Sequence, residues 1–505
     1  MQLHIGRQYT LVTEATRQEL DWIDQRLTFF DTSYAARNGV AQSVYKFFEP
    51  HMNRFLSGYA ASVVHGARTD GLTVSVTKDP PPWTIPTLET PEDFDVAGVG
   101  WLRPYQREPV RIVLGPRPRT VLKMTVGSGK TEVAAALIKL VRGWWVFAAP
   151  RTILEEQGAE RILLRTGVPI GDLRSDGRVF VDGKPVGPET HCVIPVTYQF
   201  LAEHLAWGKY GQPTNLTLCD TLARAIGFIA DEAHTIAADT FSRVAKTFTN
   251  AYYRVGLSGT PFEQGDIREA TTTGLLGSVG YSVTYPELLA QGYVCPSKIR
   301  VVPVPHAAPR GATWHAVYRE AIVRSETRAR AVADVCARAA KPMLVFVDDI
   351  KNGHLVGTAE MCRSAGLRTA VVHGGTPDGA RSFAVKGLRE GEYDCIVATE
   401  VLEAGIDVPE LRSVVIATGG KSAVAAIQRL GRGVRMSPGK DHFELWDFFD
   451  YVPGADKDSP RQHRWCAEHS RKRLNAYTVE GHKPTIGPID GPFNTYTTRW
   501  RPDAS

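Results

Sequence analysis

The most constraining feature of this 505-residue chain is a glycine-containing turn, G-S-G-K-T at residues 127–131. The residues before it, 121–124, are typical of a short strand, and residues 131–140 are rich in good helix formers. Glycines let a backbone curl around phosphates, and the N–H groups at a helix N-terminus supply positive potential. The pattern predicts a strand–loop–helix unit that cradles the phosphates of a nucleotide.

Two side chains of this turn have specific expected roles. Lys130 would reach the β- and γ-phosphates, and the Thr131 hydroxyl would bind Mg²⁺. The usual pattern has a glycine six residues before the lysine, where this chain has Met124. The residues of the turn expected to contact the nucleotide are Thr125, Gly127, Ser128, Gly129, Lys130 and Thr131.

An acidic pair, Asp231-Glu232, follows the apolar run A-I-G-F-I-A at residues 225–230. The run has strand length, and open α/β sheets bind ligands at the carboxyl ends of their strands. We expect Asp231 to hold Mg²⁺, and Glu232 to orient and deprotonate an attacking water. The turn and the acidic pair together predict hydrolysis of a nucleoside triphosphate.

The order of these and later motifs resembles the DEAH-containing helicases and translocases of superfamily 2, over roughly residues 100–480. L-R-P-Y-Q-R at 102–107 is similar to their adenine-recognising motif, which implies that Arg103 and Gln106 bind the base. Q-R-L-G-R-G-V-R at 428–435 matches their motif VI, Q-x-x-G-R-x-x-R. The match implies that Arg432 and Arg435 are arginine fingers beside Gln428. Being three residues apart, the two arginines are expected to share one face of a helix.

The same resemblance assigns the remaining motifs. It implies nucleotide contacts from Gly405 and Asp407, and coupling between the nucleotide and nucleic-acid sites through His234, Ser258 and Thr260. It also implies contacts with a nucleic-acid backbone from Arg151, Thr197 and Thr399. Such contacts read phosphates rather than bases, so sequence specificity should be low and salt dependence strong. ATP with Mg²⁺ is the expected cofactor. ATP would bridge the two lobes and close the cleft between them, and hydrolysis would open it, so that each cycle moves the backbone contacts along the strand.

We therefore expect an α/β fold: two tandem RecA-like parallel-sheet lobes with a small α+β N-terminal domain. Five prolines in residues 79–91 predict a linker. The expected boundaries are an N-terminal domain at 1–78, a linker at 79–98, lobe one at 99–292, lobe two at 293–480 and a tail at 481–505. Residues 292–296 are the expected hinge between the lobes.

Composition limits the remaining possibilities. None of the seven cysteines forms a C-x-x-C pair, which argues against zinc and iron–sulfur sites and suits a reducing cytoplasm. No apolar stretch reaches transmembrane length, so we expect no membrane partner. Residues 461–505 carry eight Lys/Arg against four Asp/Glu. The basic run at 471–473 is either a DNA contact or a solvated helix face.

The layout resembles UvsW-type phage helicases, which remodel branched DNA in recombination and replication. Branched, single-stranded or duplex DNA is then the expected partner, together with recombination or single-stranded-DNA-binding proteins. Alternatives remain: the motor of a restriction or defence complex, an ATP-gated nucleic-acid clamp, or an RNA helicase.

Two local features have more than one interpretation. A hairpin with an Asp-Gly turn at 178–186 either decorates lobe one or separates strands. The N-terminal aromatics, including Tyr45, are either core or DNA-facing.

Overall fold

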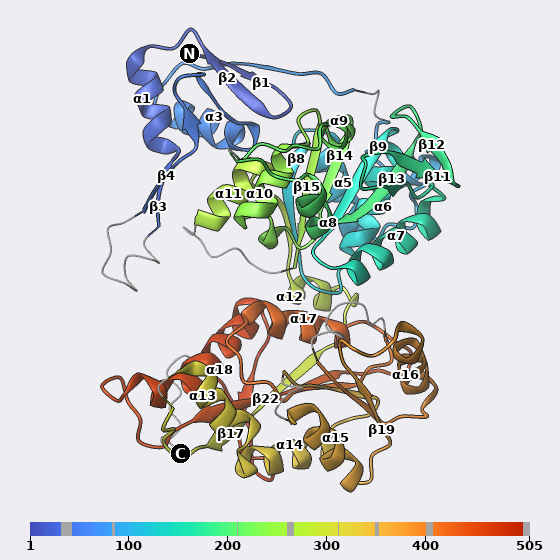
Figure 1. Ribbon diagram of the computed structural model, residues 1–505, viewed down its shortest axis with the longest axis vertical. Coiled ribbons are helices and arrows are strands. Elements are labelled where there is room, and N and C mark those ends of the chain that lie inside the picture. The colour runs from blue at the N-terminus through green and yellow to red at the C-terminus, as the bar shows by residue number, and fades with distance from the viewer. Residues whose placement is uncertain are drawn as a thin grey trace. The chain divides into compact units, whose positions relative to one another are not determined.

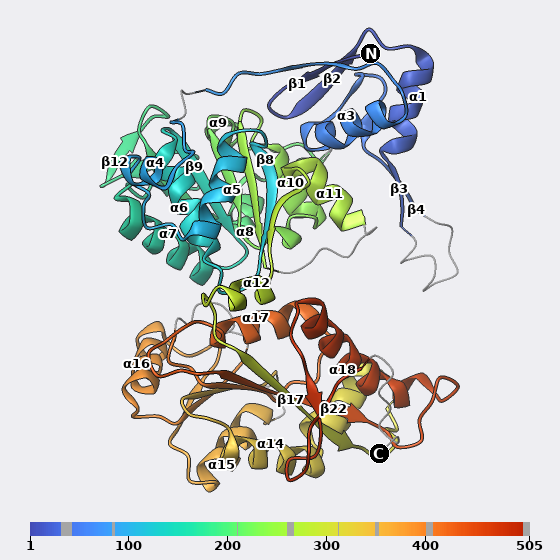
Figure 2. The ribbon, with the colours of Figure 1, turned by 180° about the vertical axis from the view of Figure 1, so that it is seen from behind.

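The computed structural model describes residues 1–31, 43–82, 86–209, 211–259, 267–311, 313–348, 353–399 and 408–497. Three predicted site residues, Thr260, Gly405 and Asp407, lie outside these ranges. The chain divides into two compact units (Figures 1 and 2). Unit 1 comprises Met1–Met124 and Gly129–Val283, and unit 2 comprises Thr125–Ser128 and Thr284–Ser505. No helix in the described ranges is both long and apolar enough to cross a membrane.

Unit 1 begins with a small α+β subdomain, as predicted. Its five-stranded sheet has the order β5-β6-β2-β1-β7, and a separate two-stranded ribbon pairs β3 with β4. Helix α1 starts at a capping box in which the Thr16 side chain and the Glu19 backbone N–H are bonded. The elements are β1 Gln2–Ile5, β2 Tyr9–Thr13, α1 Arg17–Arg26, β3 Thr28–Asp31, β4 Ser43–Lys46, β5 Phe48–Glu49, β6 Arg54–Leu56, η1 Ser57–Tyr59, α3 Ala60–Thr69 and β7 Ser75–Lys78.

Hydrogen bonds attach this subdomain to the rest of unit 1. The Arg119 guanidinium, at the start of a strand, donates to the Arg7 carbonyl at 2.7 and 3.2 Å. Gln8 donates to the Lys246 carbonyl at 2.9 Å, and the Tyr59 hydroxyl to the Ala270 carbonyl at 2.5 Å. The subdomain is therefore bonded directly to the larger sheet domain, in addition to being connected by the chain.

The larger sheet of unit 1 is parallel, with the order β13-β9-β14-β15-β8-β16. Its strands are almost continuously apolar, because helices cover both faces: α5, α6 and α7 pack together on one, and α8, α10 and α11 on the other (Figures 1 and 2). The strands are β8 Arg119–Met124, β9 Trp144–Ala149, β13 Cys192–Thr197, β14 Gly227–Ala230, β15 Tyr253–Ser258 and β16 Val279–Val283. The helices are α4 Pro91–Val96, α5 Pro104–Leu114, α6 Lys130–Leu140, α7 Thr152–Thr166, α8 Tyr198–His204, α9 Leu216–Ala223, η2 Ala233–Thr235, α10 Asp239–Lys246 and α11 Ile267–Leu276.

The hairpin predicted at 178–186 is confirmed. Strands β11 (Val179–Val181) and β12 (Lys184–Val186) pair antiparallel, and β10 (Asp172–Leu173) extends them to a three-stranded sheet. Asp182 and Gly183 at the turn have φ of 50° and 76°. Positive φ at both central residues is the geometry that an Asp-Gly turn supplies.

Unit 2 has an eight-stranded sheet with the order β19-β20-β18-β21-β22-β17-β23-β24, parallel except for its last pair. The stretch expected as a tail contributes β23 and β24 at one edge. The strands are β17 Ser297–Pro305, β18 Met343–Phe346, β19 Thr369–Val372, β20 Cys395–Ala398, β21 Ser413–Ile416, β22 Phe443–Tyr451, β23 Thr485–Ile486 and β24 Asn494–Thr495. The helices are α12 Tyr285–Ala290, α13 Trp314–Tyr318, η3 Arg319–Val323, α14 Glu326–Arg338, α15 His354–Ser364, α16 Asp378–Glu390, α17 Ala423–Gly433 and α18 Arg461–Val479.

Residues 292–296, the stretch expected as a hinge, are hydrogen-bonded within unit 2. The Cys295 backbone N–H donates to the Val434 carbonyl at 2.9 Å, and the Tyr285 hydroxyl donates to the Cys295 carbonyl at 3.1 Å. The units divide instead between Val283 and Thr284, where β16 ends and the capping box of α12 begins. The two parallel helix-covered sheets confirm the predicted fold class.

Candidate nucleotide and nucleic-acid sites

The glycine turn forms the predicted strand–loop–helix unit between β8 and α6. Gly127 and Gly129 have φ of 84° and 77°, a left-handed region that L side chains rarely adopt. The Ser128 backbone N–H donates to the Thr125 carbonyl at 3.1 Å, which closes the turn. Lys130 is the first residue of α6, with Thr131 next, at the positive end of the helix. Met124, the departure from the usual pattern, is fully buried at the end of β8 and so belongs to the strand.

A buried carboxylate that sequence reasoning missed anchors the start of α6. Glu132 is 8% exposed, and its two oxygens accept from Arg161 and from Arg165, the latter at 2.8 Å. Both arginines lie on α7, which packs along α6. The two arginines are 29 and 33 residues away in the sequence, so no local spacing predicts these ion pairs. These pairs fix the first turn of the helix that carries Lys130 and Thr131.

Gln106 lies against the phosphate loop. Gln106 is 3% exposed, and its Oε1 accepts the Arg103 backbone N–H at 2.9 Å at the start of α5. A Cβ built on Gly129 would lie 2.5 Å from Gln106 Nε2. Glycine at 129 therefore allows the Gln106 amide and the loop to meet, while Arg103 is joined to Gln106 through its backbone N–H.

The acidic pair follows β14 at the carboxyl end of the sheet. The Asp231 N–H donates to the Ala148 carbonyl at 2.9 Å, and the Glu232 N–H donates to Asp231 Oδ1 at 3.0 Å. Glu232 has φ 48° and ψ 55°, a left-handed conformation that is strained for a residue with a side chain. Burial raises the pKa of Asp231, the negative charge of Glu232 adds to this effect, and Lys130 opposes it. Lys130 therefore lies close enough to Asp231 for its charge to affect the pKa of that carboxyl.

Glu232 and His234 lie together beyond Asp231. Glu232 Oε2 is buried and accepts no hydrogen bond within the described ranges, and His234 Nδ1 lies 3.5 Å from it. Burial lowers the pKa of His234, which favours the neutral imidazole. A buried carboxylate oxygen without a donor suits a group that accepts a proton from water.

The donor set suits Mg²⁺. Thr131 and Asp231 offer one hydroxyl and one carboxylate, and Mg²⁺ bound to a nucleotide usually takes one or two protein oxygens and completes its shell with phosphates and waters. No group of three or more His, Cys, Asp or Glu side chains in the described ranges could hold a metal by itself. Thr131 and Asp231 therefore fit a nucleotide-bound Mg²⁺.

Two of the predicted nucleic-acid residues lie at or just beyond the ends of neighbouring strands. Thr197 ends β13 in register with Ala149 of β9, and the exposed Arg151 follows two residues later. The Thr197 hydroxyl accepts the Phe200 N–H at 3.0 Å and so caps α8. Ser258, a predicted coupling residue, is fully buried at the end of β15. In unit 2, Thr399 is 6% exposed, and its N–H donates to the Val372 carbonyl at 3.2 Å.

The prediction that Arg432 and Arg435 share a helix face is wrong. Helix α17 contains Gln428 and Arg432 but ends at Gly433. A Cβ at Gly433 would lie 1.8 Å from the Phe443 ring, so β22 packs directly against the helix end. Arg435 instead forms a β-bridge with Val294. Beyond Gly433 the backbone therefore pairs with residues 294–295 and does not continue the helix.

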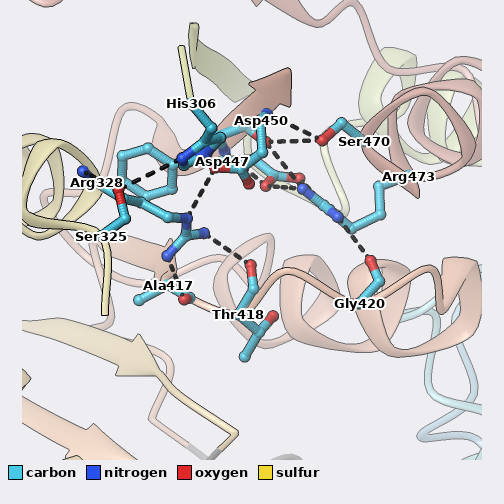
Figure 3. Close-up of polar contacts among 11 residues, drawn as sticks. His306, Ser325, Arg328, Ala417, Thr418, Gly420, Asp447, Asp450, Ser470 and Arg473 are labelled. Atoms are coloured by element: carbon cyan, nitrogen blue, oxygen red, sulfur yellow. Dashed lines mark hydrogen bonds and ion pairs between the residues drawn. The ribbon is translucent and has the colours of Figure 1, made fainter. Parts of the chain in front are cut away.

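The basic run at 471–473 is divided by the fold, and Arg473 is not a DNA-facing residue. It is 2% exposed on α18 and makes a two-bonded ion pair with Asp447 of β22, at 2.9 and 3.0 Å (Figure 3). Lys472 is exposed, and Arg471 is half-buried. Helical spacing turns every third or fourth residue inward, so one basic run serves both the core and the surface.

Two family models match the chain. "Type III restriction enzyme, res subunit" covers residues 101–263, and "Helicase conserved C-terminal domain" covers residues 327–437. The chain is 28% identical over 409 residues to "DNA 3'-5' helicase XPB" of Kineococcus radiotolerans, a match that spans 77% of this chain and 68% of that protein.

Solved structures share the fold at low sequence identity. A fragment of a putative HsdR subunit of a type I restriction enzyme from Vibrio vulnificus has a TM-score of 0.54 and 14% identity, over 90% of this chain and 78% of that one. The crystal structure of T4 UvsW aligns over 97% of this chain and 99% of that one, with 16% identity and a TM-score of 0.41. The second score is too low to carry further weight.

Proposed function

We propose that the chain is a superfamily 2 helicase that couples ATP hydrolysis to movement on DNA and remodels branched molecules by unwinding, branch migration and annealing. The observation that carries the proposal is the cluster in unit 1. Lys130, Thr131, Asp231 and Glu232 gather at the carboxyl end of one parallel sheet, with Gln106 against the phosphate loop.

Each residue has one task in the proposed hydrolysis. The Gln106 amide reads the adenine edge, and Lys130 with the loop N–H groups binds the phosphates. Glu232 orients a water and accepts its proton as the oxygen attacks the γ-phosphorus. Arg432 and Arg435 stabilise the charge that develops on the phosphoryl oxygens. Thr131 and Asp231 would hold the Mg²⁺ of a bound nucleotide, which would neutralise phosphate charge.

DNA is the proposed track because the matched relative is named as a DNA helicase. Arg151, Thr197 and Thr399 are proposed to bind backbone phosphates, so affinity should fall steeply with salt and vary little with sequence. The preference for branched DNA rests on the layout of the chain, a small N-terminal subdomain ahead of two motor sheets.

The test is steady-state ATP hydrolysis without nucleic acid and with single-stranded DNA, duplex DNA, a four-way junction and RNA. We expect DNA to stimulate turnover, most strongly in branched form, and Lys130→Ala to show no turnover with any of them. Stimulation by RNA alone would overturn the proposal.

A second candidate, the motor subunit of a restriction complex, is favoured by the family model matched over residues 101–263. The two functions separate in a displacement assay in which the purified chain must remove a third strand from duplex DNA or dissolve a four-way junction. Junction dissolution by the chain alone supports DNA remodelling. Displacement on linear duplex without junction activity supports the restriction motor, and ATP turnover without either supports a clamp.

A further inference from the structure

Helix α17 carries Gln428 and Arg432. The loop before it is bound through its backbone carbonyls by a buried guanidinium group. Arg328 of α14 is 1% exposed, and it donates to the Ala417 and Thr418 carbonyls at 2.7 and 3.0 Å (Figure 3). Its Nε donates to Asp450 at 2.9 Å. A planar guanidinium has fixed donor directions, so one side chain determines where two successive carbonyls lie.

The far end of α17 is held by a second buried cation. Lys440 is 5% exposed, and its Nζ donates to the carbonyls of Gly433, Arg435 and Pro409. Three donors is the full capacity of an ammonium group. Two of these carbonyls belong to the end of α17 and to Arg435 itself. A cation at this position also offsets the negative end of the helix.

These contacts distinguish Arg328 and Lys440 from cations that merely fill the core. Between them they bind five backbone carbonyls, four of which flank or end the segment from Ala417 to Arg435. Neither side chain is part of the motif that contains Gln428, Arg432 and Arg435. Arg328 bonds to the backbone that precedes the motif, and Lys440 bonds to the backbone at its C-terminal end.

We infer that Arg328 and Lys440 are positioning residues for ATP hydrolysis, setting the two ends of the segment that presents Arg432 and Arg435. The inference rests on the proposed function of those arginines. Misplacing a catalytic group by about 1 Å can cost about 100-fold in rate, so loss of either support should lower kcat. It should leave the KM for ATP almost unchanged, because the loop and Lys130 bind the ground state.

Two variants test the inference. Lys440→Met keeps the apolar stem and removes all three donors. Arg328→Lys keeps a charge beside Asp450 but cannot hold two carbonyls at once. Val335→Ala is the matched control, since Val335 is fully buried on the same helix as Arg328 and its apolar side chain makes no hydrogen bond to the α17 segment.

For each protein, kcat and the KM for ATP are measured at saturating DNA, together with amide hydrogen exchange of the β22 peptides. We expect kcat to fall by about 10- to 100-fold in both variants, with KM changed by less than about twofold, and Val335→Ala to keep its kcat. Unchanged kcat in both variants, or an equal fall in Val335→Ala at matched exchange, overturns the positioning role. Absence of ATP turnover in the unaltered chain would instead count against the proposed function itself.

Discussion

The ion pair between Asp447 and Arg473 gives the sharpest prediction about the stability of unit 2. Asp447 is fully buried and accepts two hydrogen bonds from Arg473 and a third from the Tyr477 hydroxyl at 2.9 Å. Asp447→Asn keeps the shape but leaves the guanidinium buried beside a neutral amide. Removing one partner of such a pair typically costs about 3–5 kcal/mol.

Native-state amide hydrogen exchange of β22 measures this cost within unit 2 and needs no two-state unfolding of the whole chain. At about 1.4 kcal/mol per decade, protection of the β22 amides should fall by about 100- to several-thousand-fold. The matched control is Asp490→Asn, which breaks the pair with Arg338. Their side chains are 77% and 50% exposed, and surface pairs contribute about 0–1 kcal/mol.

The reasoning is refuted if Asp447→Asn lowers protection no more than Asp490→Asn does. That result would mean that the Gly420 and Phe448 carbonyls, which Arg473 also contacts at 2.6 and 2.9 Å, solvate the charge adequately without a carboxylate.

Three further predictions concern the site and the pH response. Lys130→Ala should abolish ATP turnover because it removes the charge that binds the phosphates, and substantial remaining turnover in a steady-state assay would contradict that role. Arg435→Ala should lower kcat while sparing ATP binding measured by fluorescent-nucleotide titration; lost affinity with unchanged kcat would contradict the finger role. Burial lowers the pKa of His482 to about 3, so the unfolded chain binds the extra proton between about pH 6.5 and 3. Protection of unit 2 amides, corrected for intrinsic exchange, should therefore fall as pH drops through that window, and less so in His482→Gln.

Local patterns predicted the elements whose partners are near in sequence. The phosphate loop, the strand before Asp231 and the hairpin at 178–186 were all predicted, because spacing, turn residues and apolar runs determine them directly. The fold class was predicted from the resemblance of the motif order to that of superfamily 2 helicases. Whether the predicted residues bind ATP and DNA stays a prediction until the assays above are made.

Predictions that depended on packing fared differently. Arg432 and Arg435 are spaced as helical neighbours, yet β22 packs against Gly433 and ends the helix between them. Arg473 sits in a basic run typical of a solvated face, yet it pairs with a carboxylate 26 residues away. The local sequence around Gly433 or Arg473 does not predict these contacts, because it does not specify which distant strand will pack there.

The local sequence alone predicted the chemistry of the site: a phosphate-binding loop, a carboxylate expected to hold Mg²⁺, a carboxylate expected to deprotonate water, and a pair of arginines. How those groups are held depends on tertiary packing. Glu132 forms ion pairs with two arginines of α7. Arg328 and Lys440 donate hydrogen bonds to carbonyls at the two ends of the segment from Ala417 to Arg435. Residues 292–296 belong to unit 2. The physical reason is that backbone carbonyls are the same at every residue, so which of them a buried cation binds depends on packing alone.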